Sequence, residues 1–225
     1  MNADVKIVVS RVVSIKPLSQ TGYEMQLERA GIAFKAGQLI NIHGRDHFED
    51  RSYTVCSGEN DEFLTVLFRY IPSGILTPQL VDLKPGDAVK ISGPYGEFTI
   101  RDPARPMMFF ATGTGVAPCR AYLRTHPDLP VALFHGVRYA EDLFYKEEFR
   151  RIAYRPCVSR ETESTDFTAG RITDLARSVE FPPDSHFYLC GANEMIYEMQ
   201  ELLEERGVDK SHIFTEAYYY RFNDT

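Results

Sequence analysis

The chain has 225 residues, a length that accommodates two ordinary domains. Hydrophobic residues make up 44% and charged residues 25%, a balance typical of globular proteins with buried cores and not of disordered chains. The net charge of −7 argues against a nucleic-acid partner. No apolar run approaches the roughly 18 residues of a membrane helix, and the first residues lack the pattern of a signal peptide. We therefore expect a cytoplasmic protein with no membrane partner.

The cysteines and histidines do not form a recognisable metal-binding pattern. The four cysteines are widely spaced and form no CxxC pair, which excludes an internal iron–sulfur cluster of the common cysteine-rich kind: Cys56, Cys119, Cys157 and Cys190. His43 and His47 have the spacing of helical ligands, but Gly44 between them argues against a helix. We therefore expect no metal site.

The first third of the sequence alternates apolar and polar residues with a period of two, which predicts β-strands. Turn signals such as Ala36-Gly37 and Lys84-Pro85-Gly86-Asp87 separate the segments. Six short strands with such turns predict an antiparallel β-barrel. The strands are expected around Val5, Ile7 and Val9, around Tyr23, Met25 and Leu27, and over Gln38–Ile42, Ser52–Cys56, Phe63–Tyr70 and Ala88–Ile91.

The sequence changes character after Gly93-Pro94-Tyr95-Gly96 and the proline-bearing segment 102–106. We place the domain boundary there, with an N-terminal β domain at 1–101 and an α/β domain at 102–225. In the second domain apolar runs alternate with helix-like stretches, which predicts a parallel sheet covered on both faces. The expected strands are Met107–Ala111, Val131–His135, Tyr154–Val158, His186–Cys190 and His212–Thr215, and the expected helices are Pro118–Thr125, Glu141–Ile152, Ile172–Val179 and Asn193–Arg206.

Glycine-containing segments follow two of the predicted parallel strands, at the sheet edge where such folds bind ligands. Thr112-Gly113-Thr114-Gly115 follows the first strand, and Cys190-Gly191-Ala192-Asn193 follows the fourth. Glycines let a backbone approach a pyrophosphate closely, and a helix that begins there favours its negative charge. Each segment alone is also typical of a tight turn, but the two together indicate a nucleotide site.

The predicted barrel carries two further polar elements. They are Arg51, Ser52, Tyr53 and Thr54 on a strand, and Gly74, Ile75, Leu76 and Thr77 after the next strand. An arginine, two hydroxyls and a flat ring are suited to holding a phosphate, hydrogen-bonding a ring edge and stacking on a ring face. An ordinary edge strand with alternating Ser52 and Thr54 accounts for the first element equally simply.

Taken together, these motifs resemble the ferredoxin–NADP reductase family, whose members have an FAD-binding barrel followed by an α/β domain that binds NADP(H). The resemblance covers essentially the whole chain. Residues 51–54 match the family's Arg-x-Tyr-Ser/Thr flavin signature, and residues 74–77 resemble its Gly-x-x-Ser/Thr pyrophosphate element. Residues 93–98 are similar to its Gly-Pro-x-Gly-x-Phe junction. Residues 112–118 match its nucleotide loop, which includes Thr112, Gly113 and Thr114, and Cys190-Gly191 matches its Cys-Gly beside the nicotinamide.

The bacterial branch of the family is the closer likeness. Residues 136–139 with 142–145, and Ser159-Arg160-Glu161 with Gly170-Arg171-Ile172, resemble its segments at the adenosine end. The resemblance implies that Arg138 and Ser159 line this end and that Arg160 and Arg171 hold the 2′-phosphate of NADPH. The three arginines are also consistent with solvated surface charges.

The segment Phe214-Thr215-Glu216-Ala217-Tyr218 resembles the family's Glu-x-aromatic ending, although here the chain continues beyond the aromatic residue. The resemblance implies that Tyr218 and Tyr70 lie at the flavin. It assigns catalytic roles to Thr54 at the flavin's polar edge, to Cys190 beside the nicotinamide and to Glu216, which would orient the nicotinamide or relay a proton. Alternatively, Tyr218, Tyr219 and Tyr220 form an aromatic run that packs the tail.

The resemblance implies a ferredoxin/flavodoxin–NADP(+) reductase, which transfers electrons between NADPH and a ferredoxin or flavodoxin through FAD. One alternative is the reductase component of an oxygenase, or a flavin reductase; another is a non-enzymatic nucleotide-sensing or electron-transfer subunit. Ferredoxins and flavodoxins are usually acidic, and this chain is acidic too. For it to bind them, we expect basic residues to gather on one face, with these candidates: Arg101, Arg105, Arg120 and Arg124.

Overall fold

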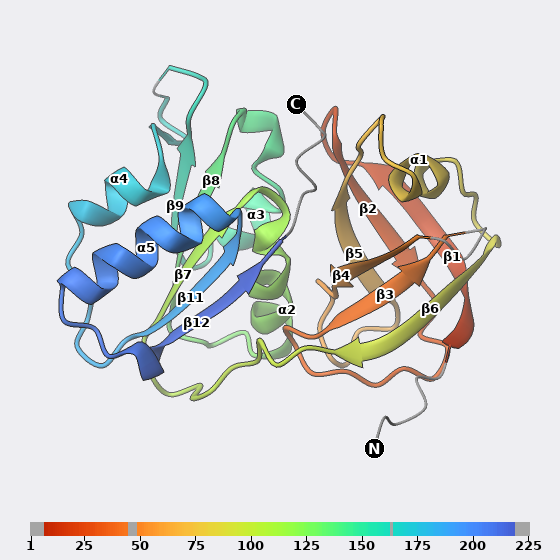
Figure 1. Cartoon of the computed structure of the whole chain (residues 1–225), viewed down its shortest axis with the longest axis horizontal. Helices are drawn as coiled ribbons and strands as arrows, with labels where there is room; N and C mark the ends of the chain where they lie inside the picture. The colour runs from red at the N-terminus through yellow and green to blue at the C-terminus, as the bar shows by residue number, and fades with distance from the viewer. Residues whose placement is uncertain (1–6, 45–48, 163, 219–225) are drawn as a thin grey trace. The chain divides into compact units, whose positions relative to one another are not determined.

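The computed structural model describes residues 7–44, 49–162 and 164–218, which form two compact units (Figure 1). The first unit comprises the described residues up to Ile100 together with Arg120–Pro127. The second comprises Arg101–Cys119 and the described residues from Asp128 onward. Among the described residues no helix is long and apolar enough to cross a membrane.

The first unit is built on one antiparallel sheet with the strand order β4-β3-β6-β1-β2-β5. Its strands are β1 (Ile7–Pro17), β2 (Gly22–Leu27), β3 (Leu39–His43), β4 (Asp50–Thr54), β5 (Leu64–Arg69) and β6 (Ala88–Tyr95). Each of the six expected strands is confirmed, and Val5, expected at the start of the first, lies outside the described residues. Alternate residues such as Met25, Leu27, Ile40 and Ile42 form the core, as their period of two predicts.

The expected antiparallel barrel is confirmed as a barrel-like sheet, which is not closed. Among the described residues β4 and β5 form no ladder; Val55, just after β4, makes an isolated antiparallel bridge with Val66, and the Cys56 amide donates to the Thr65 carbonyl oxygen at 2.8 Å. β4 has five residues, and its first three are exposed, so this edge is too short and too polar to continue the ladder.

A short helix that the sequence pattern did not predict packs on this sheet. α1 (Leu76–Val81) buries Leu76 and Leu80 in the core of the first unit. Its six residues are too few to display a helical period, which explains why the sequence shows only a turn signal at Gly74.

The second unit contains a six-stranded sheet in which every neighbouring pair is parallel, with the order β10-β9-β8-β7-β11-β12. Its strands are β7 (Met107–Thr112), β8 (Val131–Val137), β9 (Ala153–Val158), β10 (Thr168–Ala169), β11 (His186–Gly191) and β12 (Ile213–Ala217). The five predicted strands are confirmed, and β10 is an additional strand of two residues. Because β7 and β11 are neighbours, the two glycine-containing segments leave the sheet side by side.

The helices α3 (Lys146–Phe149), α4 (Ile172–Arg177) and α5 (Asn193–Glu205) belong to the second unit, whereas α2 (Ala117–Thr125) begins there and continues into the first. α4 and α5 cover one face, where their apolar side chains pack with Phe110 and Phe134 (Figure 1). On the opposite face Phe109 and Leu133 are fully buried, so both faces are covered as predicted.

The helix expected over Glu141–Ile152 is wrong for most of its length. A 3₁₀ turn occupies Ala140–Asp142, and only Lys146–Phe149 is α-helical. Tyr145 between them adopts a left-handed backbone with φ of 58°, a conformation that a continuous right-handed helix does not contain.

Candidate functional site

The site in the second unit is built where β7 and β11 end. Thr112 closes β7 and is followed by a 3₁₀ turn over Gly113–Val116, which leads directly into α2. Gly113 has φ of +53°, and no atom lies within 4 Å of the position where a Cβ would stand. Gly113 therefore adopts a conformation that favours glycine, and the space beside its Cα is empty, which leaves its backbone open to a ligand.

The two glycine-containing segments interlock. The Ala192 amide donates a 2.8 Å hydrogen bond to the Thr112 hydroxyl. A Cβ on Gly115 would lie 2.7 Å from the Cys190 carbonyl carbon, and a Cβ on Gly191 would lie 2.8 Å from the Thr112 carbonyl oxygen. Such distances leave no room for a methyl group, so glycine is required at both positions.

Two of the expected nicotinamide residues lie on neighbouring strands, and Tyr218, expected at the flavin, lies beside them. Cys190 of β11 pairs in register with Glu216 of β12, and the Tyr218 amide donates to the Gly191 carbonyl oxygen at 2.9 Å. The Tyr218 side chain also hydrogen-bonds the Cys190 thiol. Burial, with Glu216 adding to the effect, raises the pKa of Cys190 well above its usual value. Cys190 is therefore a neutral, fully buried thiol beside the loop.

The residues expected at the adenosine end gather at the ends of β8, β9 and β10. The Arg160 amide donates to the Arg138 carbonyl oxygen at 3.0 Å, and the Ser159 hydroxyl donates to the Val137 carbonyl oxygen at 3.3 Å. The Arg160 guanidinium lies 6.0 Å from the centre of the Tyr139 ring, and both side chains are exposed. A cation beside an exposed aromatic ring is suited to an adenine that carries a phosphate.

Arg171 reaches the same end of the sheet from the start of α4. Gly170 donates its amide to the Val158 carbonyl oxygen at 2.9 Å, which places the residue before Arg171 next to the end of β9. The Arg171 side chain is exposed and forms a 2.9 Å ion pair with Glu198 of α5. A phosphate that binds Arg171 therefore competes with a carboxylate for the same guanidinium.

A buried histidine that sequence reasoning missed lies beneath the nucleotide loop. His135 of β8 is fully buried; its Nε2 lies 3.0 Å from the Gly113 carbonyl oxygen and its Nδ1 lies 3.2 Å from the Tyr154 hydroxyl. Burial lowers the pKa of His135 to about 4, although the hydrogen bond to Gly113 opposes that shift. In the sequence His135 looks like one member of an apolar strand, since its partner in the loop is distant along the chain.

In the first unit the residues expected to bind flavin lie on β4 and in the segment that follows β5. Arg51 is exposed, pairs with Glu49, and donates a 2.8 Å hydrogen bond to the Asp50 carbonyl oxygen. The Ser52 hydroxyl donates to the Asn41 side-chain oxygen at 2.7 Å, and Thr54 is buried. An exposed guanidinium at the edge of the sheet is suited to an anionic ligand such as a pyrophosphate.

An aromatic row connects the two expected flavin tyrosines. The Tyr53 ring meets Phe68 edge-on at 6.1 Å, Phe68 stacks with Tyr23 at 5.7 Å, and Tyr23 meets Tyr70 at 6.1 Å. Burial raises the pKa of Tyr53, although nearby Arg51 opposes that shift, so the phenol stays protonated. Tyr53 and Tyr70 are thus linked through Tyr23 and the buried Phe68, which fixes their positions relative to one another.

The second flavin element is held by hydrogen bonds to the backbone of Ile71. The Thr77 hydroxyl accepts a hydrogen bond from the Ile71 amide at 3.0 Å and donates to the Ile71 carbonyl oxygen at 3.2 Å. Leu76 is buried, whereas Ile75 is exposed, and the Gly74 amide donates to Ile71 at 2.9 Å. The segment therefore forms a rigid turn whose exposed atoms belong to Gly74 and Ile75.

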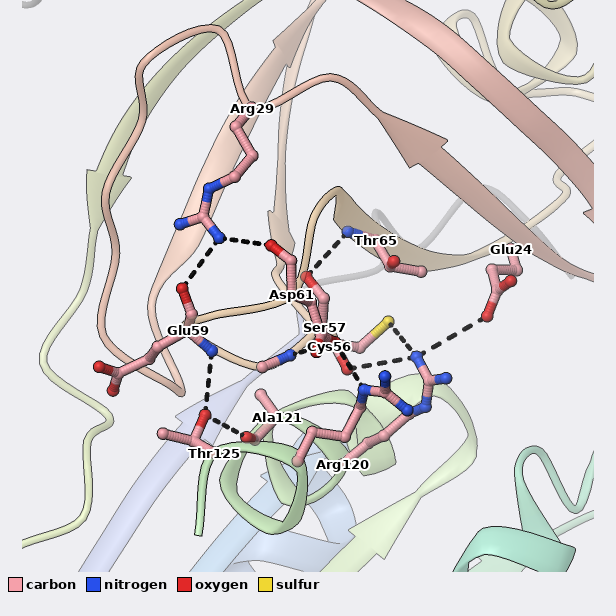
Figure 2. Close-up of polar contacts among 12 residues, drawn as sticks. Glu24, Arg29, Cys56, Ser57, Glu59, Asp61, Thr65, Arg120, Ala121 and Thr125 are labelled. Carbon is pink, nitrogen blue, oxygen red and sulfur yellow. Dashed lines mark hydrogen bonds and ion pairs between the residues drawn. The ribbon is translucent and has the colours of Figure 1, made fainter.

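A network of polar contacts fixes the turn at residues 56–61 within the first unit (Figure 2). Arg120 is buried; its Nη1 donates to the Cys56 carbonyl oxygen at 3.3 Å and lies 3.8 Å from the Glu24 carboxylate. Arg124 pairs with Asp61 at 2.6 Å. The expectation that Arg120 is a basic docking residue is therefore wrong, because its charge is buried and neutralised by Glu24.

The other two arginines expected at a docking face also have partners. Arg101 lies 5.6 Å from the centre of the Phe214 ring, and Arg105 pairs with Asp102 at 3.4 Å. These contacts leave the two side chains less free to form a continuous basic patch.

Comparison with known proteins agrees with this arrangement. The family model described as oxidoreductase FAD-binding domain matches residues 7–100, and the model described as oxidoreductase NAD-binding domain matches residues 109–201. The chain therefore carries an FAD-binding domain and an NAD-binding domain of oxidoreductases.

Two relatives match across most of the chain. The ferredoxin–NADP reductase B of Sorangium cellulosum is 30% identical over 93% of this chain and 96% of its own length. The reductase component of propane 2-monooxygenase from Rhodococcus jostii is also 30% identical over 93% of this chain, which spans 63% of that protein.

The fold has a solved counterpart. The ferredoxin NADP⁺ reductase of Neisseria gonorrhoeae with bound FAD and NADP has a TM-score of 0.86 and covers 96% of this chain and 100% of its own, at 19% sequence identity. That similarity establishes the fold, and the near full-length match to the Sorangium reductase establishes the family. The chain belongs to the ferredoxin–NADP reductase family of FAD- and NAD(P)H-dependent oxidoreductases.

Proposed function

We propose that this chain takes a hydride from NADPH onto bound FAD and passes the electrons singly to a ferredoxin or flavodoxin. The observation that carries the proposal is the interlocked pair of loops at Thr112–Gly115 and Cys190–Ala192. Their close backbone packing fixes a turn suited to binding a dinucleotide, and Gly113 in this turn is open to a ligand. The activity, the carrier and a cytoplasmic location are parts of this proposal, as is a domain boundary between residues 101 and 102.

FAD supplies the chemistry when it is bound, because it accepts a hydride and releases single electrons. The residues of the first unit would hold it. Arg51 and the exposed atoms of the turn at Gly74, Ile75, Leu76 and Thr77 would bind the pyrophosphate. Tyr53 and Tyr70 would contact planar groups of the cofactor, and Ser52 and Thr54 would meet its polar edge.

The residues of the second unit would orient the nucleotide. Thr112, Gly113 and Thr114 would hold its pyrophosphate, while Cys190, Gly191 and Glu216 would position the nicotinamide. The neutral Cys190 thiol, whose pKa is raised by burial, would provide contact without charge, and Glu216 beside it would hold or move a proton. Tyr218, bonded to both residues of the Cys190-Gly191 pair, would cover the same place until the nicotinamide enters.

A preference for NADPH over NADH follows from the adenosine end. Arg160 and Arg171 would bind the 2′-phosphate that only NADPH carries, and Arg138 and Ser159 would line the adjacent surface. Each planar guanidinium group can bind two phosphate oxygens at once. Two such arginines should therefore discriminate strongly in favour of the nucleotide that carries the extra phosphate.

A second candidate function is supported by the propane 2-monooxygenase relative, which matches this chain at the same identity as the reductase B does. On that account the chain would be the reductase component of an oxygenase or a flavin reductase, with a preference for NADH. A third possibility of a different class is a nucleotide-sensing or electron-transfer subunit that turns over only with a partner.

One set of assays separates these functions. The purified protein is given NADPH or NADH with ferredoxin, flavodoxin, free FMN or ferricyanide as acceptor. The proposed function requires NADPH to be preferred and a ferredoxin or flavodoxin to be reduced. Preference for NADH with rapid reduction of free flavin supports the second function, and failure to reduce every acceptor supports the third.

A further inference from the structure

We propose that His135 is a positioning residue for the nucleotide loop. Its neutral imidazole, held by the Tyr154 hydroxyl, hydrogen-bonds the Gly113 carbonyl oxygen and thereby orients the backbone of the loop toward the nucleotide. The inference rests on the proposed function, since it assigns a further residue to the same site. His135 does not contact the nucleotide on this account and acts through Gly113.

The hydrogen-bonding partners determine the tautomer of His135. The Gly113 carbonyl oxygen only accepts hydrogen bonds, so Nε2, which lies 3.0 Å from it, carries the proton. Burial lowers the pKa of His135 to about 4, so the ring is neutral near pH 7 and Nδ1 is an acceptor. The Tyr154 hydroxyl, 3.2 Å from Nδ1, is then the donor, and burial raises the pKa of Tyr154, which keeps its proton in place.

The orientation of the Gly113 carbonyl determines the direction of the next backbone N–H. In a planar trans peptide the C=O and the next N–H point in opposite directions. Because His135 holds the Gly113 oxygen on the sheet side, the Thr114 N–H points away from the sheet. Gly113 has φ of +53°, a left-handed conformation that a glycine can also leave at little cost, and the bond from His135 acts on the carbonyl of this residue.

The 3₁₀ turn over Gly113–Val116 holds the middle of the loop through its own backbone hydrogen bonds, other contacts restrain the two ends, and His135 adds a side-chain bond at Gly113. The Thr112 hydroxyl accepts from Ala192, and Gly115 lies against the Cys190 carbonyl. Between these points the bond from His135 adds to the 3₁₀ turn in fixing the orientation of the Gly113–Thr114 peptide. A loop without it would keep its position but would populate more than one peptide orientation, and the nucleotide would bind only a fraction of the molecules.

The first test measures binding of NADP⁺ to the FAD-loaded protein by calorimetry. His135→Phe keeps the volume and removes both hydrogen bonds, and it should raise the Kd about tenfold. His135→Gln restores a donor for Gly113 and should recover most of that loss. Tyr154→Phe leaves the Gly113 bond in place but no longer fixes the ring, so it should raise the Kd by about twofold to threefold.

His186→Phe is the matched control. His186 is a buried histidine of the same sheet, but it lies at the opposite end, where it pairs in register with Met107. Its substitution should leave the Kd for NADP⁺ unchanged. A His135→Phe variant with wild-type Kd overturns the proposal, as does one that only loses thermal stability.

A second test needs no nucleotide. Long-range ¹H–¹⁵N spectra of the histidine rings should show His135 with a protonated Nε2 and an unprotonated Nδ1 from about pH 5.5 to pH 8, assigned by loss of the signals in His135→Gln. A ring that titrates near its ordinary pKa overturns the proposal. If the wild-type protein binds neither NADPH nor NADH, the proposed function fails, whereas the spectra still report whether His135 is locked.

Discussion

Gly115 lies so close to Cys190 that a Cβ added to Gly115 would stand 2.7 Å from the Cys190 carbonyl carbon. Gly115→Ala should therefore push the two loops apart and destabilise the fold by about 1–3 kcal/mol, the usual range for overpacking. The same change should raise the KM for NADPH more than it lowers kcat. Urea unfolding and steady-state kinetics measure the two effects.

Gly207→Ala serves as the control for that variant. Gly207 has φ of +75° and no atom within 4 Å of the added Cβ, so its cost is limited to backbone strain of roughly 1–2 kcal/mol. The KM for NADPH should stay at the wild-type value. If Gly115→Ala also leaves KM unchanged, the interlocked loops do not form the nucleotide site.

Removal of the exposed guanidinium at the start of β4 should weaken FAD binding. Arg51→Ala removes charge-assisted hydrogen bonds worth about 1.5–3 kcal/mol, so the Kd for FAD should rise about 10-fold to 100-fold. Arg11→Ala is the control, because Arg11 is also exposed but donates only to the Gly86 carbonyl oxygen. Flavin fluorescence during reconstitution of apoprotein measures the Kd. Equal affinity in the two variants would show that Arg51 is an ordinary edge-strand residue.

The sequence pattern identified the sheets better than it identified their edges. Alternation at Met25–Leu27 and the apolar runs of β7 and β11 report which residues are buried, and burial determines strands in both units. The pattern does not report where a ladder stops, so the gap between β4 and β5 was not predicted. It also failed at Tyr145, whose left-handed backbone interrupts a stretch with helical composition.

The sequence predicted those residues of the candidate site that stand in short motifs. It missed the residues whose role depends on contacts with distant parts of the chain. Glycines 113 and 191 are visible in the sequence because strands end beside them. His135 is separated from Gly113 by 22 residues, and its apolar neighbours make it look like core. Arg120 follows the nucleotide loop in sequence, yet its side chain packs against Cys56 and Glu24, which no local pattern reveals.

Two arginines should determine the choice of nucleotide. Replacing both Arg160 and Arg171 by Ala should raise the apparent KM for NADPH by about 100-fold or more, because each charge-assisted bond is worth about 1.5–3 kcal/mol. The apparent KM for NADH should change less than about twofold. Arg177→Ala is the control, since Arg177 is an exposed arginine in the last turn of α4. If both nucleotides weaken equally, these arginines are structural.

Tyr218 should compete with the nicotinamide. Tyr218→Ser removes the ring and should tighten NADP⁺ binding and shift the flavin absorbance band, because a state that excludes the nucleotide is no longer populated. Tyr218→Phe keeps the ring but loses the bond to the Cys190 thiol, so it should bind NADP⁺ like the wild type. Loss of thermal stability with unchanged NADP⁺ affinity in the Ser variant would identify Tyr218 as a packing residue.

Stability should fall on acidification through the burial of His135. Its pKa is lowered to about 4 in the folded state, below the unfolded value of 6.5, so the unfolded chain binds more protons between these values. The free energy of unfolding attributable to His135 should thus drop by about 2 kcal/mol from pH 7 to pH 5. His186, whose pKa burial also lowers, acts in the same direction, so the measurement is the difference between wild type and His135→Gln. Parallel pH profiles of the two proteins would contradict the assignment.

The most direct test of the account is an anaerobic titration of the purified protein with NADPH and, separately, with NADH, followed by the flavin absorbance. We predict a yellow protein whose bound FAD is fully bleached by about one equivalent of NADPH, with NADH acting only at much higher concentration. A protein that carries no flavin, or one whose flavin NADPH does not bleach, would contradict the claim that this chain transfers hydride from NADPH to FAD.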